Sequence, residues 1–250
     1  MGIFSGLHLD PHARELVCLI GAGGKTSVMF NLASALKSMG KKVLVTTTTK
    51  IFVPSKNQCN SIVFDASGTS ARFNKIKPGS ITCLGKELNE TANKIIGVDK
   101  EVVDRLFDSR FFDWILVEGD GAKRKTIKAP QEGEPVVPEK TTLALGIIGL
   151  DALGMTVNEN HVHRCTLFCT VTGAKKNDMI DENHISRLIL SPKGLFKNIP
   201  KGTKHMVLLN KADALSNNEA PSRICRMIEK EAPHIHIAAV STKWDRVIQW

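Results

Sequence analysis

The stretch "LVCLIGAGGKTSVMF", residues 16–30, decides the fold. It runs from an apolar segment through a glycine-rich turn into a helical pattern, the order expected of a strand, a tight turn and a helix. The usual P-loop pattern is GxxxxGK[ST], and counting back from Gly24 puts Leu19 where its first glycine belongs. Since the Gly-Lys-Thr end of the pattern is intact, the stretch predicts a shortened phosphate-binding loop.

The backbone at such a turn supplies the physical basis of this prediction. N–H groups at a helix N-terminus point into the turn with a partial positive charge, and a lysine at the helix start reaches the terminal phosphates. We therefore expect nucleotide phosphates to be bound by Gly21, Ala22, Gly23, Gly24, Lys25, Thr26 and Ser27. The Thr26 hydroxyl is expected to hold Mg²⁺. The alternative is a strand-to-helix turn with a structural role only.

The rest of the chain alternates between strand and helix patterns. Strands are expected at 43–46, 62–64, 81–84, 114–118, 142–149, 205–210 and 234–240, and helices at 25–39, 102–106, 182–190 and 222–230. Residues 85–97 have the pattern of a hairpin-like excursion. This alternation predicts an α/β, P-loop NTPase-like fold with a mostly parallel sheet and helices on both faces. A single domain is expected over 1–250, with a small inserted region around 57–110.

Composition narrows the function classes. The 250 residues carry a net charge of +9 and six scattered cysteines without a CxxC pair, which favours reduced thiols over a disulfide framework. No apolar run approaches the roughly 20 residues of a membrane span, so we expect a cytoplasmic protein without a membrane partner. Positive charge also suits nucleic acid, but aromatic content is only 5%, which argues against base stacking.

The segment "VLLNKAD", residues 207–213, ends a buried strand in an NKxD pattern. GTPases use this pattern for guanine, because an Asp carboxylate accepts two hydrogen bonds that adenine cannot donate. We expect Asp213 to read the base, Lys211 to lie along it and Asn210 to brace the loop. The alternative is a simple strand-to-helix turn.

The segment "WILVEGDGAKRKTIKAP", residues 114–130, delivers two acidic residues to the end of a strand. Glu118 and Asp120 are expected to serve a Mg²⁺-dependent step together with Lys25, with Asp120 as a metal ligand and Glu118 also orienting water or a second substrate. The basic residues that follow predict contact with an anionic second substrate, through Lys123 and Lys128 above all. A solvated basic loop is the alternative.

Two further segments carry weaker signals. In the threonine run at 46–49, Thr47 is a candidate Mg²⁺ ligand, although β-branched residues at a strand end need no function. The segment "HVHRCTLFC" offers His161, His163, Cys165 and Cys169, but their spacing matches no standard zinc site. Contact with an anion through the histidines, or a nucleophilic cysteine thiolate, stays open.

Five segments of the chain carry a resemblance to a known family: "LIGAGGKTS", "VLVTTTTKIFVP", "ILVEGDGAKRKTIKAP…EPVVP", "HVHR" and "LLNKAD". Together they resemble the YqeC family, described as accessory proteins for selenium-dependent molybdenum hydroxylases. The resemblance implies a role in selenium cofactor biosynthesis or insertion, with the hydroxylase as a partner. The short P-loop also looks like that of Mur-type ATP-dependent ligases, whereas the EGDG and NKxD segments look like metallochaperone GTPases that serve nickel enzymes. GTP is favoured and ATP stays open.

Two readings of function follow. In the first, the protein hydrolyses a Mg²⁺-bound nucleotide or transfers its phosphoryl group to activate or deliver a selenium-containing group. The anionic second substrate would then be a compound such as selenophosphate or a molybdopterin phosphate. In the second, the protein is a nucleotide-gated binding module with negligible turnover that docks onto the hydroxylase.

Overall fold

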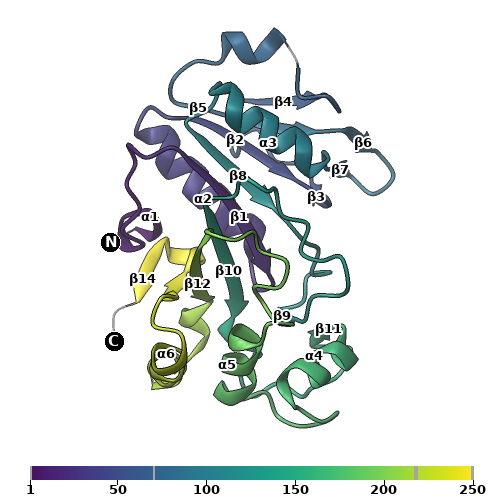
Figure 1. The fold of residues 1–250 in the computed structure, drawn as a ribbon, viewed down its shortest axis with the longest axis vertical. Coiled ribbons are helices and arrows are strands. Elements are labelled where there is room, and N and C mark those ends of the chain that lie inside the picture. Colours follow the sequence, from purple (N-terminus) through teal and green to yellow (C-terminus); the bar gives the residue numbers. More distant parts are fainter. Residues whose placement is uncertain (1, 70, 217–218, 249–250) are drawn as a thin grey trace.

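A computed structural model describes residues 2–69, 71–216 and 219–248 (Figure 1). Its central sheet has nine strands in the order β14-β13-β12-β10-β1-β8-β2-β5-β4. All neighbouring pairs in it are parallel except β13 with β14, which is antiparallel. In chain order the strands are β1 (Glu15–Gly21), β2 (Lys42–Thr47), β4 (Ser61–Phe64), β5 (Ser80–Gly85), β8 (Trp114–Glu118), β10 (Leu143–Gly149), β12 (Lys204–Asn210), β13 (His236–Ser241) and β14 (Arg246–Ile248).

Helices cover both faces of this sheet. The alternation of side chains along β1 shows the two faces: Leu16, Cys18 and Ile20 join one buried cluster, and Val17 and Leu19 join the other. On the second face lie α1 (Ile3–Gly6) and α2 (Lys25–Ser38). On the first lie α3 (Lys100–Ser109), α4 (Cys165–Thr172), α5 (Glu182–Leu190) and α6 (Glu219–Glu231). The predicted α/β class, with a mostly parallel sheet and helices on both faces, is confirmed.

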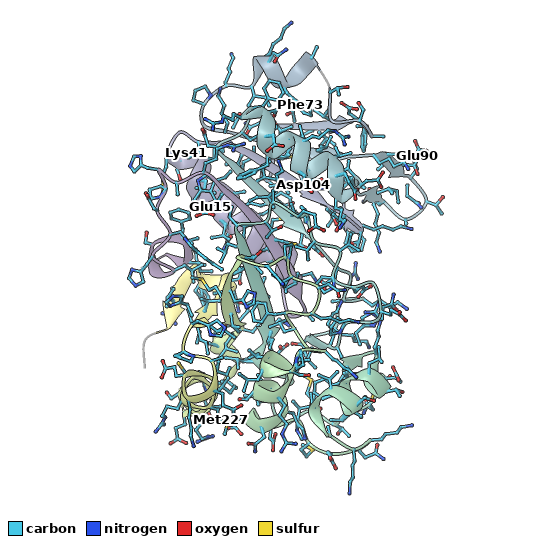
Figure 2. All side chains as sticks on the ribbon, in the orientation of Figure 1. Glu15, Lys41, Phe73, Glu90, Asp104 and Met227 are labelled. Atoms are coloured by element: carbon cyan, nitrogen blue, oxygen red, sulfur yellow. The ribbon has the colours of Figure 1, made fainter. Side chains whose placement is uncertain are left out.

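The larger of the two clusters follows the long axis of the molecule. It begins at Phe73, which is buried near one end beside α3, and reaches α6 near the other end, where Met227 is labelled (Figure 2). Fully apolar strands such as β8 and β10 are typical of a parallel sheet that is covered on both sides. A rigid frame therefore carries the loops at the strand ends.

Strand register brings the predicted motifs to one edge of the sheet. Glu118 is the register partner of both Leu19 in β1 and Thr47 in β2. On the other side, Gly149 of β10 is the partner of Asn210. Because all these strands are parallel, their carboxyl ends share this edge, which is where ligands bind in open α/β sheets.

Two small sheets lie beside the central one. The first consists of β3 (Lys50–Phe52), β7 (Lys94–Ile96) and β6 (Glu87–Asn89), all antiparallel, and includes the predicted hairpin. The second pairs β9 (Ile127–Lys128) with β11 (Val162–His163). The segment 57–110, expected as an insertion, contributes β4 and β5 to the central sheet and only β6 and β7 to the separate one. The described part of the chain also contains four 3₁₀ turns: η1 (Ala71–Lys75), η2 (Leu150–Ala152), η3 (Ala212–Ala214) and η4 (Thr242–Trp244).

Most expected elements are present with shifted ends. The α5 and β8 bounds agree with the prediction, whereas α6 begins at Glu219 and β13 begins at His236. Helix α4 was not expected in the segment around 161–169, and neither was the antiparallel strand β14. Among the described residues, none of the helices has both the length and the apolar character required to cross a membrane.

Candidate functional site

The glycine-rich turn joins β1 to α2 and requires glycine at two adjacent positions. Gly23 has φ 93° and Gly24 has φ 120°, a region that L side chains rarely adopt. A Cβ at Gly23 would lie 2.1 Å from the Gly149 nitrogen, and one at Gly24 would lie 2.5 Å from Asn210 Nδ2. Leu19, at the position of the missing first glycine, is a fully buried strand residue. The turn therefore begins two residues later than the usual pattern suggests.

The helix start carries no acidic group of its own. Gly24 is the N-cap of α2 without a side-chain cap, and no acidic residue lies in the first turn. Lys25 curls back over the turn, and its Nζ donates to the Gly21 carbonyl oxygen at 2.7 Å. An uncapped helix N-terminus with a lysine folded over it favours a bound anion.

Thr26 and Glu118 form the second part of the site. The Thr26 hydroxyl donates to Glu118 Oε2 at 2.7 Å, and the other carboxylate oxygen lies 3.8 Å from Lys25 Nζ. Burial raises the pKa of Glu118 above its ordinary value, although Lys25 and the Thr26 hydroxyl oppose this shift. The predicted pair of a helix-start hydroxyl and a strand-end carboxylate is thus in contact.

Asp120 ties the turn to a second lysine. Its Oδ2 accepts from the Gly21 N–H at 3.1 Å and from Lys128 Nζ at 2.8 Å, while its Oδ1 lies 3.2 Å from Lys25 Nζ. Burial lowers the pKa of Lys25, but Asp120 and Glu118 outweigh it, so the net direction is upward. Lys25 is therefore a protonated cation at neutral pH.

Lys128 continues this chain of charges away from the P-loop. Its Nζ contacts Glu134 Oε2 and the Gly121 carbonyl oxygen, both at 2.9 Å, in addition to Asp120. Glu134 in turn accepts two hydrogen bonds from Arg164, at 2.5 and 2.7 Å. Burial raises the pKa of Glu134, but Arg164 and Lys128 hold it below its ordinary value. Because three protein acceptors surround the Lys128 ammonium, contact with an anionic ligand would require one of these bonds to break.

Asn210 braces the turn from the opposite side. Its Nδ2 donates to the Gly23 carbonyl oxygen at 2.8 Å, and its Oδ1 accepts from the Thr242 N–H at 3.2 Å and from the Thr242 hydroxyl at 2.6 Å. Lys211 points elsewhere, since its Nζ pairs with Asp151 Oδ2 at 2.7 Å. Asp213 lies exposed in η3 and makes no hydrogen bond or ion pair with the residues that the structure describes.

The threonine run divides into buried and accessible members. Thr47 is fully buried, and its hydroxyl donates to the Glu118 carbonyl oxygen at 2.8 Å. Thr48 and Thr49 instead border the cavity described next. The Thr47 hydroxyl oxygen also accepts from the Thr49 N–H at 3.0 Å, a contact that would compete with a bound metal.

A cavity of about 960 Å³ opens in front of the turn. It is bounded by the P-loop, by the threonine run with β3 and β7, and by the loop at 121–125. Lys123, predicted to hold an anion, lines it and is exposed. This volume lies within the range of about 300–1,000 Å³ that is typical of ligand pockets. The lining residues are Gly23, Gly24, Lys25, Thr26, Ser27, Thr48, Thr49, Lys50, Ile51, Phe52, Lys94, Glu118, Gly121, Ala122, Lys123, Arg124, Lys125, Glu134 and Lys211.

The histidines and cysteines at 161–169 lie at the other end of the ion-pair chain. Cys165 and Cys169 lie on α4, and burial raises the pKa of the Cys165 thiol, the opposite of an activated thiolate. Burial and the nearby cations Arg164, Lys128 and Lys123 lower the pKa of His163 to about 4. Among the described residues, three or more His, Cys, Asp or Glu side chains are nowhere grouped to hold a metal ion.

Comparison with known proteins places this arrangement in a family. The family model described as "YqeC protein" matches residues 17–166, more than half of the chain. The chain belongs to the YqeC family. The matched residues include the P-loop, Glu118, Asp120 and the Lys128–Glu134–Arg164 chain, whereas Asn210 and Asp213 lie outside them.

Individual relatives agree with the family match. A YqeC protein of Escherichia coli (strain K12), described as uncharacterized, is 29% identical over 229 residues, covering 90% of this chain and 88% of the relative. Among solved structures, HypB from Helicobacter pylori in complex with nickel overlaps with a TM-score of 0.41 and 10% identity, covering 96% of this chain and 84% of HypB. At this level of similarity nothing further follows for the YqeC chain.

Several residues of this YqeC site have no local signal in the sequence. Glu134 and Arg164 are 30 residues apart and meet only because β9 pairs with β11. Phe52 and Lys94 are cross-strand partners of β3 and β7, which a hairpin prediction for 85–97 alone does not reveal. Thr242 directly follows the last parallel strand, β13, in the segment "AAVSTK" at residues 238–243, so its place at the carboxyl edge of the sheet could have been anticipated.

The chemistry of the Thr26 and Glu118 oxygens fits Mg²⁺. This ion prefers hard oxygen ligands in an octahedral arrangement at about 2.1 Å, so that adjacent ligands lie about 3 Å apart. The 2.7 Å between Thr26 Oγ1 and Glu118 Oε2 is close to that spacing. Asp120 is paired with Lys25 and Lys128, so it could become a Mg²⁺ ligand only if Lys25 moved away from it.

Proposed function

We propose that this protein binds a Mg²⁺-nucleotide at the P-loop and couples hydrolysis or phosphoryl transfer to a second, anionic substrate. One observation carries the proposal: Lys25 is folded over an uncapped helix N-terminus beside the Thr26–Glu118 pair. A cation, free N–H groups and a hydroxyl–carboxylate pair at the carboxyl edge of a parallel sheet are what a triphosphate and its metal require. The 960 Å³ cavity gives the ligand access.

The residues of the chain would then act as follows. Lys25 exchanges its contact with Asp120 for the terminal phosphate oxygens and neutralises their charge. Thr26 and Glu118 would hold Mg²⁺, which when bound neutralises charge on the phosphate oxygens. Asp120, released from Lys25 but still held by Lys128, keeps the turn in place through the Gly21 N–H. Glu118 orients water or the second substrate.

GTP is the favoured nucleotide. Asn210 braces the P-loop from the NKxD segment, which ties the base-reading segment to the phosphate-binding one. Asp213 is exposed, so its carboxylate has the freedom to meet the two donors of guanine. ATP is the alternative that a titration of both nucleotides separates.

The biological role proposed is that of a cytoplasmic accessory factor in selenium cofactor biosynthesis or insertion for selenium-dependent molybdenum hydroxylases. The resemblance of the motifs to the YqeC family supports this role, and the family match agrees with that resemblance. The second substrate would be a selenium- or molybdopterin-related anion, and the hydroxylase would be the protein partner.

A nucleotide-gated binding module is the second candidate. The observation that favours it is the continuous ion-pair chain from Lys25 through Asp120, Lys128 and Glu134 to Arg164 at the start of α4. A bound phosphate that draws Lys25 away from Asp120 would change the charge balance along this chain of ion pairs. The change would reach Arg164 at the start of α4, where a protein partner could bind.

Phosphate release measured over many turnovers separates the two candidates. Steady release of phosphate from GTP or ATP, lost in Glu118→Gln but not in Glu87→Gln on the exposed β6 strand, supports the enzyme. Tight stoichiometric binding without release supports the module. Neither binding nor release of any nucleoside triphosphate would refute both.

A further inference from the structure

Four of the cations that line the cavity are not used by the P-loop chemistry. Lys50 belongs to β3, Lys94 to β7, and Lys123 and Arg124 to the loop after β8. None of the four forms a salt bridge with a carboxylate of the described residues, whereas Lys25, Lys128 and Lys211 all do. Four unpaired positive charges facing one cavity repel each other unless an anion lies between them.

An aromatic ring holds two of these cations in position. The Lys94 ammonium and the Arg124 guanidinium each lie 4.8 Å from the centre of the Phe52 ring, a cation–π distance. Phe52 and Lys94 are directly opposed across the β3–β7 pair, so the strand register fixes this arrangement. Phe52 is 43% exposed, so its ring contributes less to the core than a buried phenylalanine would and is available to contact the two cations.

The backbone that presents the other pair is strained. Lys123 and Arg124 are consecutive non-glycine residues with φ of 46° and 62°. Such residues are uncommon, and the cost persists only where the surroundings fix the conformation. Here the next residue fixes it, because the Lys125 N–H donates to the Ala122 carbonyl oxygen at 2.9 Å and its ammonium donates to the Asn160 carbonyl oxygen. The loop thus holds both side chains at the cavity wall.

We propose that Lys50, Lys94, Lys123 and Arg124, the last held with Lys94 against Phe52, form a second anion site whose ligand is a small, multiply charged phosphate ester or comparable oxyanion. This inference rests on the proposed function, because it names the class of the second substrate beside the nucleotide. A small ligand is favoured over nucleic acid because the four cations line one cavity of about 960 Å³, a volume typical of small-molecule sites.

The second anion site shares its cavity with the P-loop, as group transfer requires. Thr48, Thr49 and Glu118 border the same cavity. A nucleotide whose terminal phosphate lies at Lys25 would then face the second anion within one cavity.

The test is a titration of the full-length protein with phenyl phosphate, and separately with inorganic phosphate, followed by NMR shifts of the amides at 50–52, 94 and 121–125. Mg²⁺ and a non-hydrolysable GTP analogue saturate the P-loop. In Lys94→Ala/Arg124→Ala the dissociation constant is expected to rise roughly tenfold or more for each lost charge-assisted contact. Lys193→Ala/Arg226→Ala is the matched control, since it removes one lysine and one arginine from exposed positions outside the cavity.

Two further variants separate this inference from the proposed function. Phe52→Leu keeps apolar bulk but removes the ring, so it should weaken phenyl phosphate binding without affecting the nucleotide. Lys25→Ala should abolish nucleotide binding, while phosphate should still bind at the second anion site. Should Lys25→Ala bind nucleotide normally while the phosphate results hold, the proposed function fails and the second anion site stands.

Three outcomes would overturn the second site. One is an unchanged phosphate dissociation constant in Lys94→Ala/Arg124→Ala. Another is an equal loss of nucleotide and phosphate binding in that variant, because the cations would then belong to the nucleotide site. The last is saturation by long single-stranded RNA at the same amides with no response to either phosphate.

Discussion

Replacing Asn210 by alanine should loosen the P-loop from its support. The Asn210 side chain is 2% exposed and makes three hydrogen bonds, one to the Gly23 carbonyl oxygen and two from Thr242. At about 1 kcal/mol for each net hydrogen bond, with an added penalty for the buried Gly23 oxygen left without a partner, the loss of unfolding free energy is about 2–4 kcal/mol. Thr242→Val removes only the hydroxyl donor and should cost about 1 kcal/mol.

Urea denaturation followed by circular dichroism measures both losses, and calorimetric titration measures the affinity for Mg²⁺-GTP. Asn210→Ala should also weaken Mg²⁺-GTP binding about tenfold, because the Gly23–Gly24 backbone that presents its N–H groups is no longer held. The reasoning is refuted if Asn210→Ala costs no more than Thr242→Val, or if it loses stability while nucleotide affinity stays at the wild-type value.

The remaining predictions concern pH and base choice. The pKa of Glu134 is held below its ordinary value of 4.5, so the ionised carboxylate stabilises the fold above that pH. This stabilisation is lost as the pH falls through the pKa of Glu134 in the folded state. Glu134→Gln should therefore be less stable than wild type at pH 7, and the difference in unfolding free energy should shrink at acid pH. A difference that is constant over pH would contradict this. His163 should titrate near pH 4 in NMR, and Lys123→Ala should raise the pKa of His163 by removing a nearby positive charge. An unchanged pKa of His163 in Lys123→Ala would show that the two groups do not interact. Asp213→Asn should weaken GTP about 30- to 150-fold and improve xanthosine triphosphate, and an unchanged ratio of the two affinities would reduce the NKxD segment to a turn.

The sequence is a good guide to the frame of this molecule for a physical reason. Strands β1, β8 and β10 are continuous apolar runs, and α2 follows its glycine turn with helical spacing, so local pattern and global packing agree. Helix α4 is different, because "CTLFCTVT" is rich in β-branched residues, which have low helix propensity, and its buried face of Cys165, Phe168 and Thr172 is fixed by tertiary packing. Strand β14 is three residues long and depends on its antiparallel partner β13.

In the candidate site, too, some residues can be predicted from local sequence and others cannot. The P-loop residues and the two acidic residues are neighbours in local motifs, so their meeting at one sheet edge follows from a parallel sheet. Lys128, by contrast, belongs to a run of basic residues of the kind that is usually solvated, yet it is 2% exposed between Asp120 and Glu134. Only tertiary structure distinguishes it from Lys123, which lies exposed in the same run.

The most direct measurement of the central claim is calorimetric titration of Mg²⁺-GTP and Mg²⁺-ATP into the wild type, Lys25→Met and Lys37→Met. Both lysines belong to α2, Lys25 at its start beside the glycine-rich turn and Lys37 in its last turn, so the pair is matched in residue type, charge and helix. The account predicts stoichiometric binding to the wild type and to Lys37→Met, and no measurable binding to a folded Lys25→Met. Equal affinity of the two variants for either nucleotide would contradict the assignment of 21–27 as a phosphate site.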